Sequence, residues 1–395
     1  MPERTHAGTL HEILEREEAL NRLLPARQLR ASPDAEMRAS EAVWQDAVWA
    51  EAERIGPAPL DEETRRFCLR FAQRPVFLLG VHRSGTTLAH DLLDGHAQLS
   101  VLPAEGSYLT THRAKIEAHP PADRARVYGK LWLERLVKPI HQPPYWMLGR
   151  STETRSPYVE FARRFLTFWP LMETEFGQKT ILWPFLAIVL AYALSVDRLH
   201  PGIRWWVEKT PTHEAFLDVL RRDFPSARFI HVVRDPVAVY SSRKRIDEQV
   251  SGRFRAARQV LQELERSFRI ALEEQQKGKD ASHCLLRYED VLADPEREMR
   301  RVAAHLEIDW EESLLRPTSA GIPTHPNSSF TGDMPAGAIS HATGGDAHLS
   351  QNEREAIAAC VGGLARQLGY TVEEVAPLRR WAFQTLTHIK KIDGS

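Results

Sequence analysis

The chain has 395 residues, and its 52 Lys and Arg against 53 Asp and Glu leave a formal net charge of −1. This balance argues against a protein that binds nucleic acid or an anionic membrane through a general positive surface. The hydrophobic content of 43% is enough for a sizeable core, and the length allows one large domain with additions, or two domains.

The N-terminal part of the chain is predicted to be helical. Leu10–Leu23 and Ala42–Arg54 carry apolar residues at helical spacing between charged ones. Gly56 and the prolines after it mark a break before an apolar strand that begins at Val76. We therefore expect residues 1–74 to form a helical N-terminal extension.

An apolar strand, a short loop and a helix follow one another between Pro75 and Leu88. Such a junction binds a phosphate group, because the N–H groups of the loop and of the helix N-terminus point at one anion. The spacing Gly80-x4-Gly85 is typical of a nucleotide-binding P-loop, but Thr86 replaces the lysine of G-x-x-x-x-G-K-[ST]. A nucleoside triphosphatase needs that lysine, whereas a donor with a shorter and less charged phosphate group does not. The residues expected to contact the anion are Arg83, Ser84, Gly85, Thr86 and Thr87.

Helical patterns continue after the loop helix, which is expected over Thr86–Leu93. Ser107–Ala118 is predicted to be another helix, and Pro120–Gly202 is helical and rich in aromatic residues. Because this stretch interrupts the alternation of strand and helix, we interpret residues 120–203 as an insertion. Its run Ile181–Val196 is shorter than the ~20 residues of a membrane-spanning helix, so we expect a buried or substrate-facing helix.

Two charged blocks end predicted strands in the second half of the chain. The first is Trp205–Pro211, which ends in Glu-Lys-Thr-Pro and contains Lys209. The second is Arg228–Pro236, a buried strand that ends in a charged turn at Arg234 and precedes a helix with Ser242. A dianionic phosphate calls for such a pair, an arginine and a hydroxyl from the next helix turn.

Strands and helices alternate through this half of the chain, which predicts an α/β fold with a parallel sheet and helices on both faces. In such sheets ligands bind at the carboxyl ends of the strands, where Gly80, Lys209 and Arg234 all lie. Residues 318–350 are predicted to be a loop that can serve as a lid. The other expected elements are strands at Trp205–Glu208, Phe229–Val233 and Cys284–Tyr288, and helices at Thr212–Arg222, Arg253–Gln276, Asp294–Leu306 and Gln351–Leu368.

The cysteines and the N-terminus favour a reducing cytoplasm. Cys68, Cys284 and Cys360 lack metal-ligand spacing and cannot form a disulfide framework. Met1–Leu20 is strongly charged and lacks the apolar run of a secretory signal peptide. We therefore predict a cytoplasmic protein without a transmembrane segment.

The three blocks, in this order, resemble the PAPS-dependent sulfotransferases (PAPS is 3′-phosphoadenosine 5′-phosphosulfate) and their P-loop-like fold. The resemblance is closest to the bacterial and tyrosylprotein-sulfotransferase-like branch and covers roughly residues 75–307. It implies an α/β core over residues 75–317, with the insertion on the acceptor side and residues 318–395 completing the domain. It also implies that the loop residues bind the 5′-phosphosulfate. The nucleotide residues that it implies elsewhere are Arg234 and Ser242 at the 3′-phosphate, with Arg245 beside them, and Tyr288.

The resemblance also implies the catalytic roles. Arg83 and Lys209 are expected to stabilise the sulfuryl and bridging oxygens, without a metal ion. The base is a glutamate shortly after the loop helix, and Glu105 is the one acidic residue between Asp94 and Glu117. The reserve bases are His82 and His112, since histidine is the base in other sulfotransferase branches.

Several alternatives stay open. Arg234 can instead pair with Asp235 at a helix cap, and Lys209 can be an exposed lysine paired with Glu208. The chain can also be a P-loop-type kinase, or a catalytically idle nucleotide-binding protein of the same fold. The aromatic insertion favours a small or lipid-like acceptor with a hydroxyl or amine. A carbohydrate or a peptide tyrosine remains open, and the sequence does not indicate the oligomeric state.

Overall fold

A five-stranded sheet forms the centre of the computed structural model, which describes residues 6–27, 35–137, 146–277, 282–324, 336–339 and 348–388. All neighbouring strands run parallel, in the order β2-β3-β1-β4-β5, so the predicted parallel sheet is confirmed. The register pairs Leu78 with Lys209 and Val233 with Arg287, which brings the carboxyl ends of the strands to one edge. The strands are β1 (Pro75–Leu79), β2 (Leu99–Val101), β3 (Trp205–Lys209), β4 (Arg228–Val233) and β5 (His283–Arg287).

Alternate side chains of the strands enter two different cores, as the strand pleat requires. On one face, the Phe77 ring lies 5.5 Å from the Trp206 ring and 5.9 Å from the Phe229 ring, measured between centroids. On the other face, Val76 and Leu78 pack with the apolar side of α4. Helices cover both faces, as predicted. The first face carries α8 (Trp183–Ser195), α9 (Leu217–Asp223) and α11 (Ala257–Gln276), and the second carries α4 (Thr86–Asp94), α12 (Tyr288–Ala293) and α13 (Pro295–Leu306).

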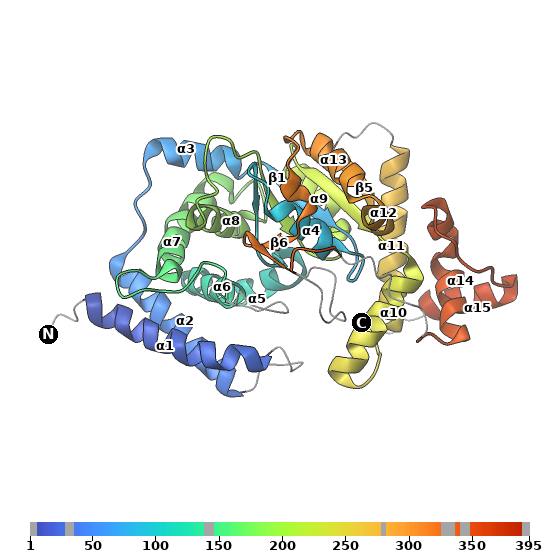
Figure 1. The fold of residues 1–395 in the computed structure, drawn as a ribbon, viewed down its shortest axis with the longest axis horizontal. Helices are drawn as coiled ribbons and strands as arrows, with labels where there is room; N and C mark the ends of the chain where they lie inside the picture. The colour runs from blue at the N-terminus through green and yellow to red at the C-terminus, as the bar shows by residue number, and fades with distance from the viewer. Residues whose placement is uncertain are drawn as a thin grey trace.

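The N-terminal helices pack on the helical insertion at one end of the molecule, opposite α14 (Gln351–Gln367) and α15 (Pro377–His388) (Figure 1). The Trp44 ring of α2 lies 5.1 Å from the Tyr158 ring of α7 in an edge-on arrangement. Trp49 lies so close to Gly129 of α6 that a Cβ there would be 2.1 Å from its ring. The extension and the insertion therefore share one core. Their helices are α1 (His6–Arg27), α2 (Ala35–Ile55), α3 (Glu62–Phe71), α6 (Pro121–Arg135) and α7 (Pro157–Phe176).

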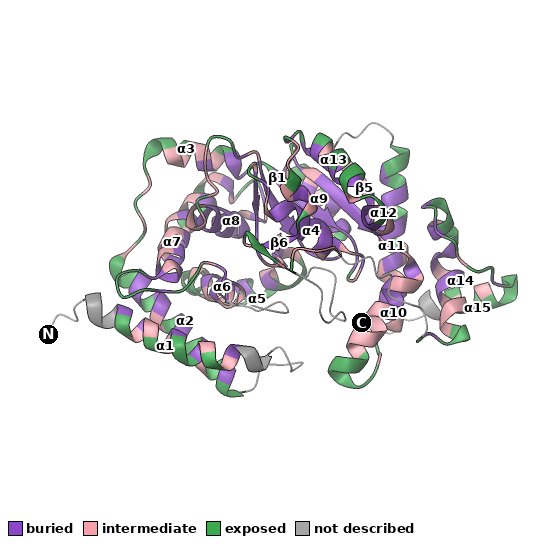
Figure 2. Cartoon of the chain, in the orientation of Figure 1, coloured by how far each residue is buried: buried purple, intermediate pink, exposed green. Residues whose placement is uncertain are grey.

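The apolar run of the insertion forms α8, whose residues from Pro184 to Ala193 are buried (Figure 2). This confirms the expectation of a buried helix. In the part of the chain that the structure describes, no helix combines the length and apolarity that crossing a bilayer requires.

Several local predictions need correction. The helix expected over Ser107–Ala118 is a π-helix at Tyr108–His112, followed by the short α5 (Arg113–Glu117). The expected helix start at Arg253 is wrong, because Gly252 ends α10 (Pro236–Ser251) at a φ of 72° and α11 begins at Ala257. The short edge strand β2 is not predicted by any pattern in the sequence.

Two other boundaries also differ from the expectation. The helix expected at Thr212–Arg222 begins as a 3₁₀ turn, His213–Phe216, before α9. Tyr288 does not end β5 but begins α12.

The C-terminal part contains more regular structure than predicted. Within the expected loop 318–350, the strands β6 (Thr318–Ser319) and β7 (Ile322–Pro323) form a small hairpin. Residues 325–335 and 340–347 of that loop lie outside the described residues. The predicted closing helix is α14 (Gln351–Gln367), and α15 (Pro377–His388) follows it.

Candidate active site

The predicted site residues gather at the carboxyl edge of the sheet. Gly80 follows β1, Lys209 ends β3, Arg234 follows β4 and Tyr288 follows β5. Because these strands are adjacent and parallel, four segments distant in the sequence meet at one edge. The loop with Glu105 follows the edge strand β2 and completes the group.

The loop after β1 has a backbone shape that few sequences allow. Gly80, Arg83 and Gly85 have φ angles of 137°, 72° and 98°. A Cβ on Gly80 would be 2.5 Å from the carbonyl oxygen of Val232, and one on Gly85 would be 2.2 Å from the Tyr288 ring. A positive φ is unfavourable for arginine by about 1–3 kcal/mol, and such strain is typical of functional loops.

The centre of this loop contains hydrogen-bonding groups suited to an anion. The Ser84 hydroxyl is buried and has no hydrogen-bond partner among the described residues. The N-cap residue of α4 is Gly85, which has no side chain to cap the helix, and the first residue of the helix is the buried Thr86. Buried polar groups normally have partners, so this hydroxyl beside the helix N-terminus is suited to contact an anion such as a phosphate group.

A second cluster joins the loop to the end of β4. Arg83 Nε donates to the Ser242 hydroxyl at 3.0 Å, and Arg234 Nη1 donates to the Arg83 carbonyl at 3.2 Å. The Arg234 guanidinium lies 4.3 Å from the centroid of the Tyr288 ring. Burial lowers the pKa of Arg83, and the charge of Arg234 lowers it further. A dianion between these guanidinium groups would relieve their mutual repulsion.

The alternative in which Arg234 serves a helix cap is not what the structure shows. Asp235 caps α10 by itself, because its carboxylate accepts from the backbone N–H of Ala238 at 2.8 Å. Arg234 contacts the phosphate loop and Tyr288 instead.

Lys209 lies between the phosphate loop and the predicted base. Its Nζ is 3.0 Å from Glu105 Oε1 and 3.2 Å from the Thr87 hydroxyl. Lys209 is buried, and its ionic partner is Glu105, not the neighbouring Glu208 of the alternative reading. Partial burial raises the pKa of Glu105, but the ammonium of Lys209, together with the charges of His82 and Arg135, outweighs this, so the pKa lies below its usual range. Glu105 is therefore ionised at neutral pH and can accept a proton.

The two reserve bases differ in their surroundings. Desolvation lowers the pKa of His82, although the nearby carboxylate of Glu105 opposes this shift. His112 is buried in the π-helix, where its Nε2 lies 2.7 Å from Arg135 Nη2. Arg135 also donates to the backbone carbonyl of Glu105. His112 is thus engaged with a cation, and Glu105 is the group that contacts Lys209.

The structure adds Arg243 to the predicted basic residues. Its charge lowers the pKa of both Arg83 and His82, and its Nε donates to Asp247 at 3.0 Å. The sequence run Arg-Lys-Arg signalled this region, but it did not distinguish Arg243 from Arg245. Arg245 is half-buried on α10, and its part in the site stays a prediction.

A buried polar network that sequence reasoning missed supports the phosphate loop from behind. Glu214 Oε2 accepts from the backbone N–H of Gly80 at 3.0 Å, and burial raises the pKa of Glu214. His231 Nε2 lies 2.8 Å from the Ser267 hydroxyl, which in turn hydrogen-bonds Glu214. These contacts fix the first residue of the loop to the face of the sheet.

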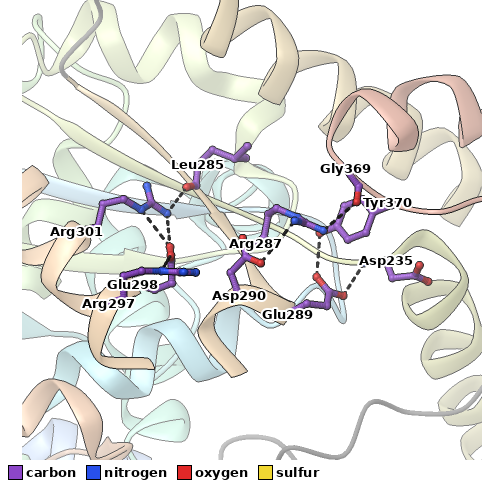
Figure 3. A network of polar contacts seen from close by, with 10 residues as sticks. All are labelled: Asp235, Leu285, Arg287, Glu289, Asp290, Arg297, Glu298, Arg301, Gly369 and Tyr370. Carbon is purple, nitrogen blue, oxygen red and sulfur yellow. Dashed lines mark hydrogen bonds and ion pairs between the residues drawn. The ribbon is translucent and has the colours of Figure 1, made fainter. Parts of the chain in front are cut away.

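The helix with Ser242 is anchored to the end of β5 (Figure 3). Glu289 accepts from the backbone N–H of Asp235 at 2.9 Å and from the Tyr370 hydroxyl at 3.0 Å. Arg287 donates to the Gly369 carbonyl at 3.2 Å beside it. The segment after α14 therefore helps to fix the position of α10, and with it Ser242.

A cavity of about 150 Å³ lies beside the π-helix. The rings of Trp169 and Trp183 meet edge-on in its wall, 4.7 Å apart between centroids. Tyr108, three residues after Glu105, is also part of the wall. The other lining residues are Arg113, Ile116, Glu117, Arg124, Gly177, Ile181 and Pro184.

Comparisons with known proteins identify the family of the chain. The sequence profile of the sulfotransferase family matches residues 75–312, which contain every predicted site residue. The chain belongs to the sulfotransferase family. It is 27% identical over 277 residues to omega-hydroxy-beta-dihydromenaquinone-9 sulfotransferase Stf3 of Mycobacterium bovis, and equally to that of Mycobacterium tuberculosis. The alignment covers 62% of this chain and 66% of each relative.

The chain is also similar to solved structures of sulfotransferases. The sulfotransferase domain of the Synechococcus PCC 7002 olefin synthase has a TM-score of 0.45 and 19% identity, covering 76% of this chain and 96% of that domain. Sulfotransferase STF9 of Mycobacterium avium has a TM-score of 0.39 and 16% identity, covering 90% of this chain and 97% of its own.

Proposed function

We propose that the protein transfers the sulfuryl group of PAPS to a hydroxyl, or an amine, of an acceptor. The observation that carries this proposal is the placement of Lys209. Its ammonium contacts both the Thr87 hydroxyl of the phosphate loop and the Glu105 carboxylate. One cation thus links the group that would bind the donor with the group that would deprotonate the acceptor.

The donor would bind across the two clusters. Its 5′-phosphosulfate would accept from the loop amides and from the hydroxyls of Ser84, Thr86 and Thr87. Its 3′-phosphate would lie between Arg234 and Ser242, with Tyr288 against Arg234. The Arg83 side chain faces Ser242, so we propose that it contacts the nucleotide phosphates, and we propose that Lys209 stabilises the sulfuryl group. The sequence prediction that Arg83 also stabilises the sulfuryl group is kept as part of the proposal.

Transfer would proceed by in-line attack. The acceptor oxygen attacks sulfur while Glu105 accepts its proton, and the bond between sulfur and the 5′-phosphate oxygen breaks. The negative charge that grows on that oxygen is stabilised by Lys209 and Thr87. These side chains supply the required cation and hydroxyl, so we propose that transfer proceeds without a metal ion.

We propose a lipid-like alcohol as the acceptor. The insertion beside Glu105 is apolar, and the cavity next to the π-helix has three aromatic rings among its lining side chains, together with three charged ones. The mycobacterial relatives are named for a hydroxylated menaquinone, which is a lipid with a terminal hydroxyl. A hydroxyl next to Glu105 and an apolar body along the insertion would satisfy both ends of such a molecule. We propose a cytoplasmic location for the protein and no role in nucleic-acid binding.

Sulfate transfer from radiolabelled PAPS tests this function. The acceptor panel contains a long-chain isoprenoid alcohol, a phenol, a tyrosine peptide and an amino sugar. We expect label on the isoprenoid alcohol with the wild type, and transfer that is about 10²- to 10⁴-fold slower with Glu105→Gln. Glu160→Gln is the matched control, because Glu160 is another half-buried carboxylate, paired with Arg163 at 2.8 Å. Donor binding without label on any acceptor would favour the idle protein, and phosphate transfer from Mg²⁺–ATP would favour the kinase.

A further inference from the structure

Two three-residue segments that are distant in the sequence contact each other at the edge of the sheet. Lys209 Nζ meets Glu105 Oε1 at 3.0 Å. Glu208 Oε1 accepts from the backbone N–H of Gly106 at 3.1 Å, and the Thr210 hydroxyl accepts from that of Ser107 at 2.8 Å. Residues 208–210 thus hold residues 105–107 at three points, with the ion pair flanked by two backbone contacts.

The carboxylate in this arrangement is itself fixed in place. Glu208 is fully buried, and its Oε1 also accepts from the Thr210 hydroxyl. Its Oε2 lies 2.9 Å from His213 Nδ1, and His213 is buried as well. The Glu208 side chain therefore has a defined position from which its Oε1 accepts the amide of Gly106.

The loop is held from the opposite side too. A Cβ on Gly106 would be 2.7 Å from both Glu208 Oε1 and the Phe185 ring of α8, so the loop is clamped between β3 and the insertion. Arg135 of α6 donates to the Glu105 carbonyl, and His90 Nε2 lies 2.8 Å from the Leu102 carbonyl. Displacement of the loop would therefore disturb contacts on both of its sides.

We propose that Glu208 and Thr210 are positioning residues that set the base Glu105 against Lys209. The inference rests on the proposed function, because it assumes that Glu105 is the base. Neither Glu208 nor Thr210 needs to touch substrate for this role. They act through the two amides that follow Glu105 and so determine where its carboxylate lies.

This role has a consequence that mere structural support lacks. Three charged or titratable groups face Glu105, namely Lys209 from β3, His82 from the phosphate loop and Arg135 from α6. Lys209 is the strongest influence that lowers the Glu105 pKa, while burial raises it. If the loop moves away from Lys209, the ammonium no longer lowers the Glu105 pKa, while burial of the carboxylate still raises it. The pKa of the base then rises, and the acidic limb of the pH–rate profile moves to higher pH.

Thr210→Val tests the inference, because valine has the shape of threonine and lacks its hydroxyl. We expect kcat to fall on the order of 10²-fold, since small misplacements of a catalytic group have effects of this size. The acidic limb should move to higher pH while the affinity for 3′-phosphoadenosine 5′-phosphate stays the same. Thr210→Ser retains the hydroxyl and should restore both values. The matched control is Thr180→Val, because Thr180 is also buried and its hydroxyl accepts from the Leu182 amide at 3.0 Å.

Gly106→Ala is the second variant and displaces the same loop without removing a hydroxyl. It should shift the acidic limb in the same direction, and nucleotide affinity again reports that the protein has folded. If the wild type is active and both Thr210→Val and Gly106→Ala keep the wild-type kcat and the wild-type position of the acidic limb, the positioning role is overturned. The proposed function is unaffected by that result. A fall in kcat without movement of the limb would also overturn the positioning role, since that indicates only structural support. A wild type that transfers sulfate to no acceptor would remove the proposed function and this inference together.

Discussion

Replacing Arg234 by alanine gives a quantitative test of the 3′-phosphate site. Arg234 Nη1 donates to the Arg83 carbonyl at 3.2 Å, and the Arg234 guanidinium lies 4.3 Å from the centroid of the Tyr288 ring. Because Arg83 in turn donates to the Ser242 hydroxyl, we assign the Arg234 guanidinium and Ser242 to the same phosphate site. A hydrogen bond to a charged group contributes about 1.5–3 kcal/mol. The loss of one such contact corresponds to an approximately 10- to 150-fold weaker affinity for 3′-phosphoadenosine 5′-phosphate. Relief of the repulsion between Arg234 and Arg83 places the expected value toward the lower end.

Isothermal titration calorimetry with two ligands isolates this contribution. The Kd of 3′-phosphoadenosine 5′-phosphate should rise for Arg234→Ala, whereas that of 5′-AMP, which lacks the 3′-phosphate, should change little. Lys244→Ala is the matched control, because Lys244 is on the same helix and pairs with Glu353 at 2.8 Å. It removes the same charge outside the cluster and should leave both affinities unchanged. Equal losses for the two ligands, or no loss at all, would refute the assignment of Arg234.

Three further predictions concern the loop and the catalytic pair. Glu105→Gln should lower kcat about 10²- to 10⁴-fold with unchanged nucleotide affinity, as single-turnover transfer will measure; a smaller fall would point to His82 as the base. The wild type should show no acidic limb near pH 5 or above, because Lys209 holds the pKa of Glu105 below its usual range. A carboxyl titration of Lys209→Met, followed by NMR, should give a higher pKa for Glu105, because the variant lacks the strongest of the influences that lower this pKa. Gly85→Ala should lower the free energy of unfolding by about 1–3 kcal/mol and weaken nucleotide binding, because its Cβ would enter the Tyr288 ring. Retained stability in urea titrations would contradict this account of the loop.

Much of the fold could be predicted because its signals are local. The phosphate loop follows an apolar strand, and its glycines and hydroxyls stand at fixed offsets. Lys209 and Arg234 each stand at the carboxyl end of a predicted strand. Because such ends lie at one edge of a parallel sheet, the predicted sheet was sufficient to bring the two residues together. The edge strand β2 could not be predicted, since its three residues are too few for a period to show. The π-helix at Tyr108–His112 has only five residues, too few for a sequence period to distinguish it from the α-helix expected there.

The contacts within the site depend on geometry that no local pattern encodes. The positive φ of Arg83 turns its side chain toward Ser242, a residue far away in the sequence. Which of Arg243 and Arg245 lies near the phosphate loop depends on the rotation of α10 about its axis. The Glu-Lys-Thr-Pro block did contain Glu208 and Thr210, but their partners became visible only when the loop after β2 was placed beside β3.

The most direct test of the central claim is thermal stabilisation by 3′-phosphoadenosine 5′-phosphate, with 5′-AMP and Mg²⁺–ATP measured alongside. A ligand that binds only the folded protein stabilises it by about 2.7 kcal/mol at a concentration of 100 Kd, which raises the melting temperature. The proposed donor site predicts a rise that is selective for the 3′,5′-bisphosphate and absent in Arg234→Ala. A rise with Mg²⁺–ATP alone, or with none of the three ligands, would contradict the sulfotransferase account of this site.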